Sequence, residues 1–149
     1  IQLFDSWAGS LAPADYERHV LPASQKIFEG LADANVPRIH FGVGTGELLG
    51  LMSAAGPDVV GIDWRVSIES ARSRVGNCAL QGNLDPAVCL TDWATIKAHT
   101  DVILDQAGGA SHVFNLGHGV LPETNPDMLA KLVDYVHSRE SNLKNPTNN

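Results

Sequence analysis

Five short apolar runs, each followed by a helical pattern, constrain this chain more than any other feature of its sequence. The runs are rich in Val, Ile, Leu and Phe, and each ends in glycine or polar residues; they lie at residues 2–4, 39–43, 59–62, 79–81 and 112–116. Strands that alternate with helices over short connections pair in parallel, because a parallel pair needs a crossover between its strands. The pattern therefore predicts an α/β fold with parallel strands.

The intervening helices are recognisable from their periodicity and from the residues that start and stop them. We expect them at residues 14–20, 22–34, 47–55, 67–75, 90–107 and 126–138. Gly56-Pro57 and Gly108-Gly109 follow two of these segments, as is typical of helix ends. Asn125 before Pro126 is a favourable N-cap with proline at the first helical position.

Two architectures accommodate this order of elements. Run 59–62, Val-Val-Gly-Ile, is apolar on both faces, as expected of a parallel strand covered by helices. Such strands form either an open doubly wound sheet or part of a closed (β/α)8 barrel. In both architectures the functional residues lie at the carboxyl ends of the strands.

Composition excludes several classes of protein. The 149 residues are 44% hydrophobic and carry a net charge of −7, which argues for a globular domain and against a nucleic-acid binder with a basic face. No apolar run approaches the ~20 residues that cross a bilayer, so we expect no membrane association. Cys78 and Cys89 lack the spacing of a zinc site, and we expect no metal.

Two polar residues at the predicted strand ends are candidates for ligand binding. His118 lies between glycines in Asn-Leu-Gly-His-Gly, where the backbone is free to direct the imidazole into a cavity. Ser6 follows the first strand and has no Gly-x-Ser-x-Gly context, so a ligand-binding hydroxyl suits it better than a nucleophile.

A glycine loop supports an alternative function. Gly42 lies near the end of the second run, Gly44 and Gly46 follow it, and Asp63 comes directly after the third run about twenty residues later. This arrangement resembles a class I S-adenosylmethionine-dependent methyltransferase, with Asp63 binding the ribose hydroxyls. His40 occupies a position where such enzymes usually carry an acidic residue, and the glycine spacing differs from Gly-x-Gly-x-x-Gly. A non-catalytic module that binds a partner through its glycine-rich edge is a further alternative.

The chain as a whole resembles the uroporphyrinogen decarboxylase family. The resemblance runs in order from Gln2 to about His137; its motifs are Gln-Leu-Phe-Asp-Ser-Trp-Ala-Gly, Gly-Ile-Asp-Trp-Arg, Leu-Gln-Gly-Asn-Leu-Asp-Pro and Phe-Asn-Leu-Gly-His-Gly. Gly-Asn-Leu-Asp-Pro and Asn-Leu-Gly-His-Gly are the most specific of them.

The resemblance implies a (β/α)8 barrel that acts without a cofactor on a cyclic tetrapyrrole. Such an enzyme removes carbon dioxide from the four acetate arms of uroporphyrinogen III and leaves coproporphyrinogen III, a step of haem and porphyrin biosynthesis. By the same resemblance, Ser6 and His118 contact substrate, His118 binds a substrate carboxylate, and Phe4 lies beside the cavity. The resemblance also implies a cytoplasmic enzyme and, at full length, a homodimer.

The chain departs from a complete member of this family. The family's substrate-binding arginines, aspartate and tyrosine lie in an amino-terminal part to which no segment here corresponds, so we assign no catalytic residue. Five units in 149 residues scale to roughly 240 for eight, near the ~250 of a whole barrel. We therefore expect the carboxyl-terminal five β/α units of a barrel over residues 1–137, a disordered polar tail over residues 138–149, and no activity of this chain alone.

Overall fold

Within residues 1–144, which the computed structural model describes, five parallel strands form one sheet. The strands are β1 (Gln2–Asp5), β2 (Ile39–Gly42), β3 (Val59–Gly61), β4 (Ala79–Gln81) and β5 (His112–Val113). Their order in the sheet is their order in the sequence, and every neighbouring pair is parallel. A doubly wound sheet reverses its strand order at a switch point, whereas a (β/α)8 barrel does not. The alternative of an open doubly wound sheet is therefore wrong.

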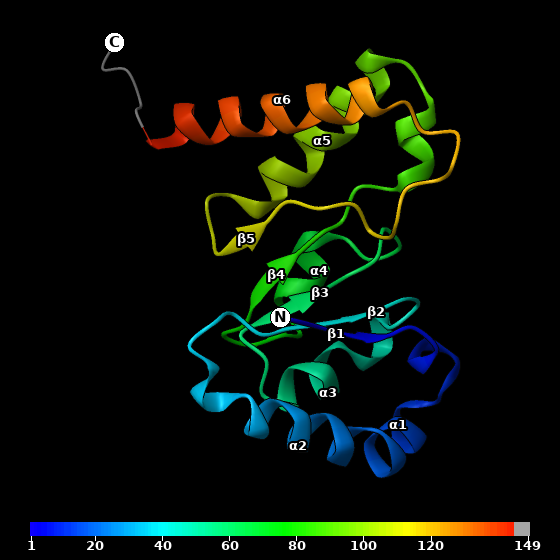
Figure 1. The fold of residues 1–149 in the computed structure, drawn as a ribbon, viewed down its shortest axis with the longest axis vertical. Coiled ribbons are helices and arrows are strands. Elements are labelled where there is room, and N and C mark those ends of the chain that lie inside the picture. Colours follow the sequence, from blue (N-terminus) through cyan, green and yellow to red (C-terminus); the bar gives the residue numbers. More distant parts are fainter. Residues whose placement is uncertain (145–149) are drawn as a thin grey trace.

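The helices follow the same order as the strands. They are α1 (Pro13–His19), α2 (Leu21–Gly30), α3 (Leu49–Ala54), α4 (Ile68–Arg72), α5 (Trp93–Ala107) and α6 (Pro126–Lys144), with short 3-10 turns between some of them. Figure 1 shows α1, α2 and α3 beside the β1–β2 end of the sheet and α5 and α6 beyond β5. Helix α3 packs on α2, α5 on α4, and α6 on α5. Helices and strands therefore advance together around one arc.

Helix ends differ from the prediction where capping side chains decide them. Helix α5 starts at Trp93 instead of residue 90, because the Asp92 side chain accepts a hydrogen bond from the Thr95 N–H at 3.0 Å and caps the helix. At α6 the predicted cap is confirmed, since Asn125 accepts from the Asp127 N–H at 2.9 Å.

The end expected for the last helix at Ser138 is wrong. Helix α6 continues to Lys144, because polar residues such as Arg139 and Glu140 have good helix propensity and do not stop a helix. Residues 145–149 of the expected tail lie outside the described part of the chain.

The fifth strand is shorter than its apolar run. Only His112 and Val113 join the ladder with β4, and Leu116 pairs with Leu84 through an isolated bridge. Residues 114–116 therefore leave the regular strand conformation before the loop that carries His118.

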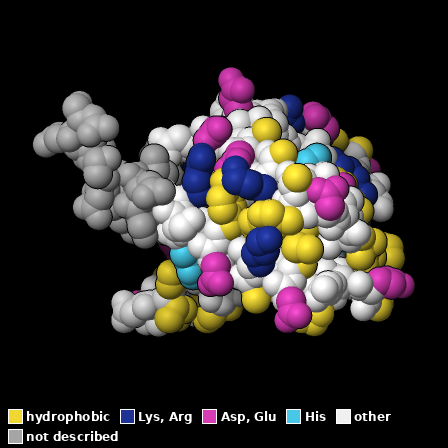
Figure 2. Space-filling view, turned by 90° about the horizontal axis from the view of Figure 1, so that it is seen from above, with side chains coloured by type: hydrophobic (Ala, Val, Ile, Leu, Met, Phe, Trp, Pro, Cys, Tyr) yellow, Lys and Arg dark blue, Asp and Glu magenta, His cyan; other side chains and the backbone are white. Residues whose placement is uncertain are grey.

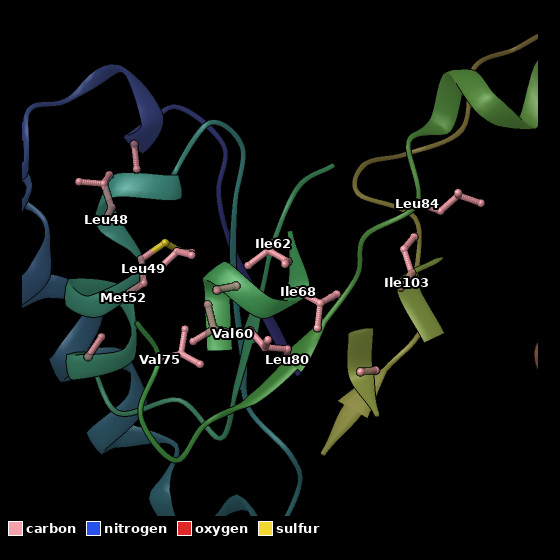
Figure 3. Packing of buried hydrophobic residues seen from close by; sticks show 14 of the residues in the cluster. Leu48, Leu49, Met52, Val60, Ile62, Ile68, Val75, Leu80, Leu84 and Ile103 are labelled. Atoms are coloured by element: carbon pink, nitrogen blue, oxygen red, sulfur yellow. The ribbon is translucent and has the colours of Figure 1, made fainter. Parts of the chain in front are cut away.

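The core lies between the sheet and the helices. Leu49 and Met52 of α3 point toward Val60 of β3 and the following Ile62, and Ile68 of α4 lies near Leu80 of β4 (Figure 3). All of these side chains are buried. Burying a large apolar side chain stabilises the fold by about 1.5–3 kcal/mol, so this layer holds the helices on the sheet.

The opposite face of the sheet has a different character. Leu3 and Leu80 belong to the helix-side core, and the residues that alternate with them, such as Gln2, Phe4 and Gln81, face the other way. Phe4 leaves 64% of its surface exposed. This face corresponds to the interior of a barrel, and it carries the pocket described next.

Candidate functional site

A pocket of about 440 Å³ lies at the carboxyl ends of the strands, on the face of the sheet away from the helices. Its walls come from β1, β2, β4 and the loop after β5. Parallel strands place their carboxyl ends at one edge, so residues distant in sequence meet there. The three residues expected at a binding site, Phe4, Ser6 and His118, all line this pocket.

Aromatic rings form one side of the pocket. The rings of Phe4 and Phe41 meet edge to face with centroids 5.8 Å apart, and the Phe41 ring lies 6.5 Å from the His118 imidazole. Edge-to-face contact holds aromatic side chains in a defined relative orientation. The pocket therefore combines a planar apolar wall with the hydroxyl of Ser6 and the imidazole of His118.

Sequence reasoning missed an amide pair at this pocket. Gln81 Nε2 donates a hydrogen bond to Gln2 Oε1 at 3.0 Å, which joins β4 to β1 across the sheet. Both side chains line the pocket. A glutamine within an apolar strand, alternating with a core leucine, is the signal that could have identified them.

Asp63 occupies a closed environment. Its carboxylate is buried and accepts hydrogen bonds from the Gly44 N–H at 2.5 Å, the Arg65 N–H at 2.9 Å and Arg65 Nη1 at 2.7 Å. The Arg65 guanidinium also lies 4.1 Å from the centroid of the Trp64 ring. These donors occupy the oxygens that a ribose would need, so Asp63 holds the protein's own loops together.

A second polar cluster, which the sequence did not reveal, lies behind the pocket. His40 and Tyr16 are fully buried, and His40 Nε2 lies 3.6 Å from Asp5 Oδ2. Burial, reinforced by the Asp5 carboxylate, raises the pKa of Tyr16 to about 12. Burial also lowers the pKa of His40, although the Met52 carbonyl and Asp5 act in the opposite direction. Both groups are therefore neutral at pH 7.

Lys and Arg are absent from the pocket wall as far as the described residues form it. The three arginines that follow β3 bind elsewhere: Arg65 pairs with Asp63, Arg72 donates to the carbonyls of Cys78 and Ser111, and Arg74 donates to Gly46 and Glu47. On the face drawn in Figure 2, cationic, acidic and apolar side chains are interspersed. The pocket offers hydroxyl, amide and imidazole groups to a ligand.

The described residues contain no group of three or more His, Cys, Asp or Glu side chains suited to a metal ion. Over the same residues, every helix is too short or too polar to cross a bilayer.

Comparison with known proteins decides the family. A profile described as uroporphyrinogen decarboxylase (URO-D) matches residues 1–139. This chain belongs to the uroporphyrinogen decarboxylase family. The proteins of that name from Streptomyces coelicolor, Nocardia farcinica and Thermobifida fusca are 61%, 59% and 58% identical to it over 141, 144 and 144 residues. These alignments cover 93%, 92% and 95% of this chain, which spans 40%, 41% and 40% of the respective relatives.

Membership of the uroporphyrinogen decarboxylase family corrects the alternative drawn from the glycine loop. A class I S-adenosylmethionine-dependent methyltransferase binds its ligand where the strand order reverses, and the strand order here is sequential. The loop of Gly42, Gly44 and Gly46 instead packs against Asp63 and the loop after β1. The five parallel strands and their helices are consistent with part of the family's barrel.

Proposed function

We propose that this chain forms one side of the substrate pocket of a uroporphyrinogen decarboxylase, a carboxy-lyase of haem and porphyrin biosynthesis. The observation that carries the proposal is the convergence of Phe4, Ser6 and His118 on one pocket in a chain of this family. Phe4 lies in β1 and Ser6 directly follows it, whereas His118 lies in the loop after β5, the strand at the opposite edge of the sheet.

Each of these side chains suits part of a tetrapyrrole. The exposed Phe4 ring and the adjoining Phe41 ring provide a flat apolar surface for a pyrrole unit. The Ser6 hydroxyl and a ring N–H of His118 can donate hydrogen bonds to a propionate or acetate carboxylate. The Gln2–Gln81 pair keeps further N–H groups at the pocket.

The reaction requires a proton and an electron sink, and no metal or organic cofactor. Protonation of the pyrrole ring makes it accept the electron pair of the breaking C–C bond, so that CO2 leaves and an exocyclic methylene forms. The methylene then takes up a proton to become a methyl group, and the ring loses its added proton. Each acetate arm therefore consumes one proton and releases one CO2. Stabilising the ring cation at this stage accelerates the reaction.

The absence of Lys and Arg from the described pocket wall is the reason why this chain is proposed to be inactive alone. Uroporphyrinogen carries eight carboxylates, and the described lining residues include neither Lys nor Arg. The hydroxyl and amide donors of the wall orient an anion but do not balance the charge of eight carboxylates. The remaining part of the relatives' length is the proposed source of the cations and of the catalytic proton donor.

Three further properties belong to this proposal: residues 1–137 act as one barrel unit, the full-length enzyme is a homodimer, and it works in the cytoplasm. The family relationship supports the last two, and the unpaired thiols of Cys78 and Cys89 agree with a reducing compartment. Size-exclusion chromatography of the full-length protein tests the oligomeric state, and fractionation of the cells tests the location.

A chimera tests the decarboxylase function directly. This chain replaces the matched 141-residue region of the Streptomyces coelicolor relative, and the product is incubated anaerobically with uroporphyrinogen III. Chromatography of the oxidised products then measures coproporphyrin. We expect decarboxylation by the chimera and none by the 149-residue chain alone. A folded chimera that releases no coproporphyrin contradicts the proposal, and turnover by the isolated chain contradicts its inactivity.

Substitutions in the chimera test the named residues. His118→Ala and Ser6→Ala are expected to raise KM, since each removes a donor to a substrate carboxylate, by about 10-fold for a lost charge-assisted hydrogen bond. His99→Ala, at an exposed position of α5, is the matched control and is expected to leave KM unchanged. Equal effects of His118→Ala and His99→Ala on KM would contradict the assignment of His118 to the binding site.

A further inference from the structure

We propose that Asp63 is the positioning residue of the pocket: it fixes the separation of the two loops that carry Ser6 and His118. This inference rests on the proposed function of that pocket. Ser6 follows β1 and His118 follows β5. These are the two edge strands of the described sheet, and they are not hydrogen-bonded to each other, so strand pairing does not fix the distance between the two loops. Asp63 follows the central strand β3.

The first connection runs from Asp63 to the loop after β2. Asp63 Oδ2 accepts the Gly44 N–H at 2.5 Å, and Gly44 has a φ of +70°, which glycine adopts without strain. The carboxylate side chain is 1% exposed. A hydrogen bond between a buried carboxylate and a backbone N–H is charge-assisted and is among the stronger bonds in proteins. The conformation of the Gly44 loop is therefore coupled to the Asp63 carboxylate.

The second connection runs from the Gly44 loop to the loop that carries Ser6. A Cβ atom at Gly9 would lie 2.2 Å from the Val43 carbonyl oxygen and 2.8 Å from the Gly44 carbonyl carbon. The backbone of the β1 loop therefore lies directly against the backbone of the β2 loop. Any movement of Gly44 is transmitted to the segment between Ser6 and Gly9, because no flexible side chain separates the two.

The third connection runs from Asp63 to the loop that carries His118. A Cβ atom at Gly117 would lie 2.6 Å from the Trp64 nitrogen and 3.1 Å from the Asp63 carbonyl carbon. Asn83 Nδ2 donates to the Asp63 carbonyl at 2.8 Å and adds the β4 loop to the same junction. Asp63 therefore touches or bonds the loops after β2, β4 and β5, and reaches the β1 loop through Gly44.

The chain contains a matched ion pair at the other end of the sheet. Asp58, which directly precedes β3, accepts hydrogen bonds from the N–H, Nε and Nη2 of Arg38 at 2.9, 3.0 and 2.9 Å. Asp63 likewise accepts from the backbone and guanidinium of one arginine, Arg65, and additionally from Gly44. Asp58 lies at the amino end of β3, away from the pocket, so Asp58→Asn is the control for Asp63→Asn.

The test compares Asp63→Asn with Asp58→Asn in the chimera described above, at a temperature where circular dichroism shows both variants folded. We expect kcat/KM of Asp63→Asn to fall about 10- to 100-fold, since small displacements of binding groups have effects of this size. Asp58→Asn is expected to stay within about twofold of the unsubstituted chimera, because distant sites act independently. Equal values for the two folded variants overturn the inference.

Two further measurements keep the test decisive. If Asp63→Asn does not fold, Asp63→Glu replaces it, because glutamate keeps the charge and changes the distance to Gly44; unchanged kcat/KM in this variant overturns the inference. The second measurement uses NMR of the 149-residue chain and needs no activity. Asp63→Asn, or Asp63→Glu in its place, is expected to shift the Gly44 amide and His118 imidazole signals, whereas Asp58→Asn leaves both in place.

The two proposals fail in different ways. An unsubstituted chimera that releases no coproporphyrin contradicts the proposed decarboxylase function. Shifted Gly44 and His118 NMR signals in the Asp63 variant of the 149-residue chain would still support the role of Asp63 in placing the loops. An active chimera in which neither Asp63 variant changes kcat/KM removes the role of Asp63 and leaves the decarboxylase function standing.

Discussion

His40 Nε2 lies 3.6 Å from Oδ2 of Asp5, the residue that directly precedes Ser6, and both atoms are buried. The His40 Nδ1–H faces the Met52 carbonyl at 3.3 Å, so Nε2 is the unprotonated nitrogen of the neutral ring. Neither His40 Nε2 nor Asp5 Oδ2 has a hydrogen-bond partner among the described residues. Burial keeps the His40 imidazole neutral. Burying this polar ring costs free energy, which the packing of the surrounding core offsets.

Replacing His40 by leucine is expected to reduce the pH dependence of stability. Burial lowers the pKa of His40 from its usual 6.5, so the unfolded chain binds this proton first as the pH falls. The stability that neutral His40 contributes is complete above pH 6.5 and is lost as the pH falls toward the folded-state pKa. The lost slope is at most about 1.4 kcal/mol per pH unit. Denaturant unfolding of the 149-residue chain between pH 5 and 7 measures it.

The control for this experiment is His99→Gln, at an exposed position of α5. It removes a histidine without changing the buried cluster, and we expect it to leave the slope as it is. A slope that survives His40→Leu shows that other groups cause the pH dependence.

Asp58→Asn is expected to make the chain less stable at neutral pH and less sensitive to acid. Hydrogen bonds from Arg38 lower the pKa of Asp58 below its usual 3.8. Its contribution is therefore present above pH 3.8 and is lost as the pH falls through the lower pKa of the folded state. Thermal unfolding at pH 7 and at pH 3 measures the difference. Asp134 is an exposed carboxylate on α6, and Asp134→Asn is expected to leave the unfolding temperature unchanged at both pH values.

Leu80→Ala is expected to destabilise the chain by about 2–5 kcal/mol, because it opens a cavity in the layer between β4 and the helices. The side chain is fully buried. Leu90→Ala removes the same atoms from a position that is 47% exposed and is expected to cost about 0.5 kcal/mol or less. Denaturant unfolding measures the free energy of unfolding of the two variants. Similar decreases in both would contradict the packing of Leu80.

Gly117→Ala and Gly119→Ala differ by two positions and are expected to behave differently. The added methyl of Gly117→Ala meets the Trp64 nitrogen at 2.6 Å, whereas nothing lies within 4 Å of the corresponding position at Gly119. Gly117→Ala should therefore cost about 1–3 kcal/mol by overpacking, and Gly119→Ala about 0.5 kcal/mol or less. Thermal unfolding compares them. A tolerated Gly117→Ala would show that the His118 loop does not press on Trp64.

Local features of the fold were predictable because neighbouring residues determine them. The run at residues 79–81 is β4 with the same bounds, and Asn125 caps α6 as its position before Pro126 suggested. Ser6 and His118 were expected at one edge because parallel strands end together, and Phe4 was expected beside them from the family resemblance; all three line one pocket. The predicted helix starts and ends were less accurate, since a cap such as Asp92 competes with other polar residues nearby.

Contacts between distant residues were not predictable from one sequence. Gln2 and Gln81 are 79 positions apart, and nothing local joins them. His40 was noted only as a departure from a methyltransferase pattern, and its burial against Asp5 depends on how α2 and α3 pack on the sheet. In the methyltransferase alternative Asp63 was expected to bind a ribose, because the loop of Gly42, Gly44 and Gly46 resembles one that binds nucleotides.

The alternation of strands and helices, the parallel pairing and the chemistry available at the strand ends were determined by the sequence alone, since hydrophobic periodicity and turn residues act over a few positions. Only the tertiary structure decided the order of the strands, and with it whether Asp63 faces a ligand or the protein's own loops. An acidic residue after a strand is compatible with both. The choice depends on which backbone N–H groups surround the carboxylate when the strands assemble in sequential order.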